Sequence, residues 1–139
     1  MITSSSAEVP LKSAPIQPEW IIEGQPKARN AILSQSSDRS AVTLVWDCTA
    51  GRFNWYYDVD ETVHITKGEV VVSTDGKEFA RLQRGDVAFF PAGTHAVWHV
   101  ETYVRKVAFC RKPLPTVVGI PMRIFWKVRG MMRSPSMAM

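Results

Sequence analysis

The chain of 139 residues has the length of one domain and leaves no room for two ordinary domains. Its composition, 45% hydrophobic and 22% charged, is close to the globular average, which excludes a chain that is disordered throughout. The net charge of +4 is uneven: residues 102–139 hold eight basic residues and no acidic one, and the rest holds nine basic and 13 acidic residues. The basic character therefore belongs to the tail and does not indicate nucleic-acid binding by the whole protein.

Other sequence features bear on the compartment. No run of about 18 uncharged apolar residues occurs, so we expect no membrane span. The N-terminal residues lack the charged start and apolar run of a secretory signal. Cys48 and Cys110 both lie in apolar runs and are expected to be free, packed thiols. These observations together predict a cytoplasmic protein.

The chain divides into three segments. Residues 1–18 are rich in Ser and Pro and predict a flexible N-terminal segment. Residues 19–112 form the expected β domain. The tail, residues 113–139, is basic and contains prolines, of which Pro121 suits the first turn of a short helix that ends before Gly130. We expect this tail to pack on the domain or on a neighbouring subunit.

Short β-rich runs dominate the domain. The apolar residues 20–22 predict an edge strand, and residues 34–40, SQSSDRS, predict a loop. From residue 41 to residue 110, runs of about five residues recur at a spacing of about ten, separated by turn signals. Asp75-Gly76 is the clearest of these signals, because both residues tolerate a positive φ in a hairpin turn. The pattern favours a β-sandwich or a β-barrel.

Two glycine-containing motifs carry the most specific signal. The first spans residues 51–68 and has six residues between Glu61 and Gly68; the second spans residues 85–93 and contains Pro91. Sixteen residues separate the two motifs. Their glycines mark corners between strands, where a positive φ is needed.

These motifs resemble the two motifs of the cupin superfamily. More narrowly, WDCTAGRFNWYYDVDETVHITKGEV and RGDVAFFPAGTHAVWHV resemble the small RmlC-like cupins grouped with the cupin domain of (S)-ureidoglycine aminohydrolase. The resemblance covers residues 20–110. It implies an all-β double-stranded β-helix, the cupin jelly-roll barrel, with the short basic tail or helix outside it. It implies the fold more strongly than a function.

The resemblance also implies where a metal would bind. Typical cupins hold Mn, Fe, Ni or Zn through histidines and a carboxylate. For the ureidoglycine enzyme, the resemblance implies a metal-ligand set of Glu, His, His and Gln. These four positions align with Trp55, Tyr57, Glu61 and Ala96. Only Glu61 among them binds a divalent metal well, and a stable site usually needs at least three protein ligands. We therefore expect no metal and no other cofactor.

The three histidines are not expected to complete that site. Because side chains alternate along a strand, His64 should face away from Glu61, and His95 and His99 should face away from Ala96. His64 and His99 are expected at the surface or at a dimer interface.

The candidate ligand-binding residues are Trp55, Tyr57, Glu61 and Trp98. Alternation places the first three on one face and Trp98 on another inward-pointing strand. An aromatic pocket with one carboxylate suits a small ligand that carries a cation or an amide N–H. A packed aromatic core with a structural Glu61 explains the same residues, and Arg105-Lys106 is a weaker candidate for the rim.

Three hypotheses on function follow. The first is a cupin that binds a small molecule in the barrel without a full metal site. The second is an aminohydrolase- or lyase-type enzyme that acts on a small ureido compound, with Glu61 as base or sole metal carboxylate. The third is a structural or assembly protein whose basic tail contacts an acidic partner. In each case we expect a homodimer, since small cupins commonly pair through their sheets and residues 20–22 could lend an edge strand.

Overall fold

The computed structural model describes residues 1–76 and 78–113, which form eight β-strands and one short 3-10 helix. The elements in chain order are β1 (Lys12–Ser13), η1 (Pro18–Trp20), β2 (Ile21–Gly24), β3 (Ala28–Gln35), β4 (Ala41–Tyr56), β5 (Asp60–Thr74), β6 (Glu78–Gln83), β7 (Val87–Phe90) and β8 (His95–Arg111). The predicted all-β class is confirmed. The described part of the chain contains no helix with the length and hydropathy needed to cross a membrane.

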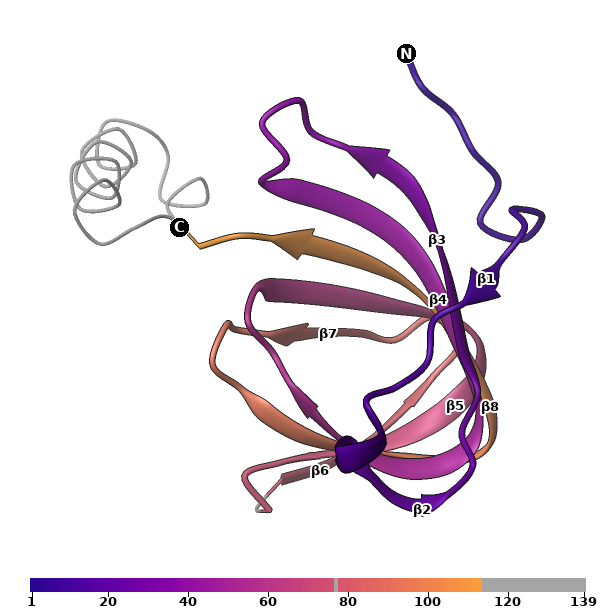
Figure 1. Cartoon of the computed structure of the whole chain (residues 1–139), viewed down its shortest axis with the longest axis vertical. Helices are drawn as coiled ribbons and strands as arrows, with labels where there is room; N and C mark the ends of the chain where they lie inside the picture. The colour runs from indigo at the N-terminus through magenta and orange to yellow at the C-terminus, as the bar shows by residue number, and fades with distance from the viewer. Residues whose placement is uncertain (77, 114–139) are drawn as a thin grey trace.

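Three long antiparallel strands organise the fold. β8 pairs along its length with both β4 and β5. One half of this three-stranded unit is flanked by β3 and β7, and the other half by β2 and β6. The sheet folds over so that its two halves face each other across the interior (Figure 1). This arrangement confirms the cupin jelly roll.

The long strands bend at irregularities in their pairing. The register of β4 against β8 shifts between Thr49 and Gly51, and that of β5 against β8 shifts on both sides of Lys67 and Gly68. Gly68 has a φ of 72°, and a Cβ added there would lie 2.0 Å from the carbonyl oxygen of Tyr103. A glycine is therefore required at this corner for its backbone conformation and for space.

The expected short runs are joined into longer strands. Residues 42–46 and residues 52–57, which the sequence separates, fall almost entirely within the single strand β4. A bulge bends a strand without ending its pairing, which explains the difference. The predicted hairpin is confirmed: Asp75 and Gly76, with φ values of 51° and 66°, connect β5 to β6.

The N-terminal segment contributes to the sheet. β1 pairs with β3, the backbone N–H of Ala14 donates to the carbonyl of Ala28 at 2.9 Å, and Ile16 is buried. The sheet thus begins before residue 19, where the sequence places the domain boundary. β2, which follows Trp20, pairs with β4 of the same chain. The expected helix of the tail lies in residues 114–139, outside the described residues.

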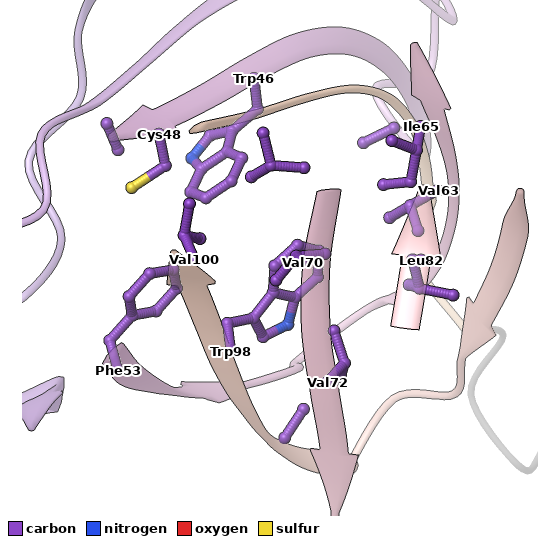
Figure 2. Close-up of a cluster of buried hydrophobic side chains, with 14 of the residues drawn as sticks. Trp46, Cys48, Phe53, Val63, Ile65, Val70, Val72, Leu82, Trp98 and Val100 are labelled. Carbon is purple, nitrogen blue, oxygen red and sulfur yellow. The ribbon is translucent and has the colours of Figure 1, made fainter. Parts of the chain in front are cut away.

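Aromatic side chains fill the space between the two halves of the sheet. Trp46, Phe53 and Trp98 are buried and point into the interior from β4 and β8 (Figure 2). The Trp46 and Trp98 rings meet edge to face with centroids 5.8 Å apart, and Phe53 stacks on Trp98 at 6.5 Å. Contacts between aromatic rings, two of them tryptophans, therefore make up the centre of the core.

We predict that Gly68→Ala lowers the free energy of unfolding by more than about 3 kcal/mol, because the new Cβ collides with the backbone of β8. Gly85→Ala is the matched control: Gly85 also has a positive φ, of 95°, but nothing lies within 4 Å of an added Cβ. It should cost about 1–2 kcal/mol, from backbone conformation alone. Urea unfolding measures both values. Equal losses in the two variants would contradict the close approach of Gly68 to β8.

Candidate functional site

The interior holds one charged pair contributed by neighbouring strands. Glu61 lies on β5 and Lys106 on β8, and the side chains are only 10% and 6% exposed. In the strand register, Lys106 pairs with Trp46 and Glu61 pairs with Cys110. Alternation along each strand points these four side chains into the barrel.

The Lys106 ammonium has three partners. Its Nζ lies 2.8 Å from Glu61 Oε2, and it sits over the rings of Trp46 and Trp98 at 4.8 Å and 4.6 Å from their centroids. The Cys110 thiol donates to the other oxygen, Glu61 Oε1, at 3.3 Å. The carboxylate and the aromatic faces together compensate the ammonium for its loss of water.

A cavity of about 310 Å³ adjoins this pair. Its wall is formed by Ala14, Pro15, Asn30, Leu44, Trp46, Trp55, Glu61 and Lys106. The half-buried Trp55 meets Trp20 and Trp46 edge to face, with centroids 5.2 Å and 5.9 Å apart. The cavity therefore joins an aromatic wall to a compensated ion pair.

The structure separates the four candidate residues into two pairs. Trp55 and Glu61 line the cavity, whereas Tyr57 and Trp98 are not among its lining residues and belong to the core cluster. Trp98 Nε1 donates to the Tyr57 hydroxyl at 3.1 Å, and Tyr57 stacks on Phe90 at 4.6 Å. Burial, followed by the negative charge of Glu61, raises the pKa of Tyr57 well above its usual value. Tyr57 is therefore a neutral core residue near neutral pH.

The sequence pattern places Lys106 only at the rim and does not single out Trp46, Asn30 or Leu44 as candidate ligand-binding residues. A signal for Lys106 was present: it lies eight residues after Trp98, an even spacing that puts both on the same face of one strand. Its proximity to Glu61, which precedes it by 45 residues, depends on the pairing of β5 with β8. That pairing is not visible in the local pattern.

The histidines lie away from the cavity. His64 and His99 are exposed, as alternation predicts. His95 stacks on Tyr56 at 4.6 Å, and its Nε2 lies 2.7 Å from Asn54 Oδ1. All three belong to the outer surface of the barrel.

Both cysteines are free, as predicted. Burial raises the pKa of Cys48 and of Cys110 to about 12, and the nearby negative charges of Asp47 and Glu61 add to the effect. Since the thiolate is the reactive form, both are unreactive near neutral pH.

The sequence matches the EutQ-like cupin domain over residues 35–108, more than half of the chain. The chain belongs to the EutQ-like cupin family. This cupin is 30% identical over 100 residues to the uncharacterized protein YdbB of Bacillus subtilis strain 168, an alignment that covers 69% of this chain and 84% of YdbB.

Solved structures share the fold. A DUF861-family protein of unknown function from Pseudomonas syringae pv. tomato strain DC3000 superposes with a TM-score of 0.68 at 24% identity, over 74% of this cupin and 45% of that chain. The Clostridium difficile EutQ protein superposes with a TM-score of 0.55 at 18% identity, over 62% of this cupin and 63% of that chain. This cupin therefore spans less than half of the Pseudomonas protein, and the likeness is one of fold.

The residues of this cupin do not fit the metal of typical cupins. Of the four positions that the resemblance aligns with metal ligands of the ureidoglycine enzyme, Trp55, Tyr57 and Ala96 offer no good metal ligand. The remaining position, Glu61, is bound by the cation of Lys106. In the part of the chain that the structure describes, no three His, Cys, Asp or Glu side chains form a cluster that could hold a metal ion.

We predict that Lys106→Met lowers the free energy of unfolding by about 3–5 kcal/mol, because it leaves a buried carboxylate without its cation. Glu61→Gln should cost about 1–3 kcal/mol. The double variant should lose less than the sum of the two, since neither charge is left alone. Urea unfolding of the wild type, the two single variants and the double variant measures the coupling free energy between the two charges.

The matched control is the surface pair Arg81–Glu69, whose side chains are 50% and 40% exposed. Glu69→Gln should change stability by less than about 1 kcal/mol. Additive losses at Glu61 and Lys106 would show that the two charges do not compensate each other.

Proposed function

We propose that this cupin binds a small, uncharged polar molecule inside its barrel, without a full metal site. The observation that supports this is the cavity of about 310 Å³, in which Trp46 and Trp55 lie beside a buried carboxylate. This volume is at the lower end of the range of small-molecule sites, so the ligand would be a small metabolite.

The ion pair favours a neutral ligand with an N–H donor. The sequence alone is compatible with either a cation or an amide N–H as the group bound by Glu61. Lys106 already supplies a positive charge to this carboxylate, so a second cation would be repelled. A carboxylate has about four acceptor positions, and Glu61 receives donors from Lys106 and Cys110. Acceptor capacity therefore remains for an amide or ureide N–H.

A second candidate is an aminohydrolase- or lyase-type enzyme that acts on a small ureido compound. It rests on the resemblance to the cupin domain of (S)-ureidoglycine aminohydrolase, and membership of that narrower group is part of this proposal. Glu61 beside a bound N–H would have the position of a general base. A role of Glu61 as sole metal carboxylate is less well supported, because Lys106 occupies it. The third hypothesis depends on the basic tail, whose residues 114–139 lie outside the described structure.

We predict that a small-metabolite library contains compounds that raise the melting temperature of the wild type, and that Glu61→Gln abolishes this response. Trp55→Ala should weaken it, because an aromatic wall of the cavity is lost. Glu69 is an exposed carboxylate on the same strand, so the Glu69→Gln variant should respond like the wild type. Equal ligand responses in Glu61→Gln and wild type would reject the pocket.

Ammonia release from a ureido compound, present in wild type and absent in Glu61→Gln, would favour the enzyme over the binding protein.

We also propose that this cupin is cytoplasmic and forms a homodimer. Two free cysteines support a reducing compartment.

The homodimer is supported by exposed apolar side chains. On the outer face of the barrel, Val87 and Phe89 of β7 and Phe109 of β8 are 63%, 58% and 48% exposed. Phe89 and Phe109 both pair with Thr62 of β5, so their side chains lie on the same face of the sheet, on either side of this strand. Such surfaces often mark contacts between proteins, and we assign this one to a second copy of the chain.

We predict a dimer mass by light scattering at micromolar concentration, and a monomer mass for Phe89→Lys. Phe79→Lys is the matched control, because Phe79 is 75% exposed but lies on β6, in the other half of the sheet. It should leave the dimer intact. A monomeric wild type would contradict the homodimer, and a dimeric Phe89→Lys would move the interface elsewhere.

A further inference from the structure

The cation of Lys106 is fixed inside the barrel by its surroundings. Its side chain is 6% exposed, its Nζ bonds to Glu61, and the rings of Trp46 and Trp98 cover two further sides. A buried ammonium without such partners would be strongly disfavoured. Lys106 is therefore an internal positive charge that the fold itself supplies.

The residues next to this cation include two of the side-chain types that bind divalent metals. By the resemblance stated above, Glu61 aligns with a metal ligand of the ureidoglycine enzyme, and Cys110 Sγ lies 3.3 Å from its Oε1. Carboxylate and thiol side chains are both ligands of zinc and cobalt. A metal ion that reached Glu61 would have this second ligand close by.

The Glu61 carboxylate can be reached from the cavity. Glu61 and Lys106 both line the cavity of about 310 Å³, and Cys110 is only half-buried. A hydrated ion can therefore approach the pair. What it meets there is the positive charge of Lys106, which lies 2.8 Å from the carboxylate oxygen. Like charges at such separations in a poorly solvated interior repel each other strongly.

We propose that Lys106 takes the place of a metal ion in this barrel: its ammonium neutralises Glu61 and excludes divalent cations from the Glu61–Cys110 pair. The other aligned positions offer no metal ligands, which weakens a metal site. Lys106 then repels a cation from the two ligands that remain, Glu61 and Cys110. This inference does not depend on the identity of any ligand of the cavity.

The proposal makes Lys106 the residue that keeps a metal ion from the two remaining ligands, Glu61 and Cys110. Replacing it by a neutral side chain of similar length, Lys106→Met, should leave Glu61 and Cys110 free to bind one divalent ion together. Binding forms a metal–sulfur bond and releases the thiol proton to the buffer. Lys106→Arg keeps the charge and should continue to exclude the metal.

Cobalt(II) is the probe, because a cobalt–thiolate bond gives a charge-transfer absorption band. We expect no such band when the full-length wild type or Lys106→Arg is titrated with cobalt chloride. Lys106→Met should show the band and bind cobalt at least about a hundredfold more tightly than the wild type. The double variant Lys106→Met/Cys110→Ser should lose the band.

Lys106→His provides a second test if Lys106→Met does not fold, since its imidazole adds a third metal ligand. It should bind zinc, and zinc should raise its melting temperature while leaving that of the wild type unchanged. Wild-type protein that binds cobalt as tightly as Lys106→Met would overturn the proposal. So would a folded Lys106→Met or Lys106→His that binds metal no more tightly than the wild type. None of these outcomes depends on whether the cavity binds a small metabolite.

Discussion

The Lys106 ammonium and the Glu61 carboxylate share an interior whose other walls are tryptophan, valine and isoleucine side chains. Neither charge would be stable there alone, because the surrounding side chains replace only part of the water that each group loses. Each therefore depends on the other and on the orientation of Trp46 and Trp98. This contact joins β5 to β8 through their side chains. It also determines the charge that the adjoining cavity presents to a ligand.

The bends of the long strands make that contact possible. β4, β5 and β8 run through both halves of the sheet, so one strand can supply residues to two walls. β8, for example, contributes Trp98 from one half and Lys106 from the other, and the ammonium of the second covers the ring of the first. At the corresponding corner of β5, Gly68 lets the two backbones approach closely, because a Cβ there would collide with the carbonyl of Tyr103 in β8. Backbone geometry at the corners thus determines which side chains meet in the interior.

The sequence predicts the fold well, because glycine corners, a hairpin dipeptide and alternating apolar residues are local signals. It predicts the outward orientation of His64 and His99 for the same reason. It does not predict that Glu61 meets Lys106, because their contact depends on strand pairing between residues 45 positions apart. Nor does it separate Trp55, which lines the cavity, from Tyr57, which packs in the core. Both lie on one face of the chain, and only the packing of neighbouring elements decides which of them borders empty space.

One wall of the cavity is formed by residues that precede the family match, two of them in the N-terminal segment. Ala14, Pro15 and Asn30 border the cavity, yet all three precede residue 35, where the match to the family begins. The ion pair and both tryptophans that line the cavity fall within the match. A change in the short segment that holds Ala14 and Pro15 would therefore reshape one wall of the cavity and leave the ion pair in place. The selectivity of the cavity can therefore change through a peripheral segment, without any substitution in the barrel itself.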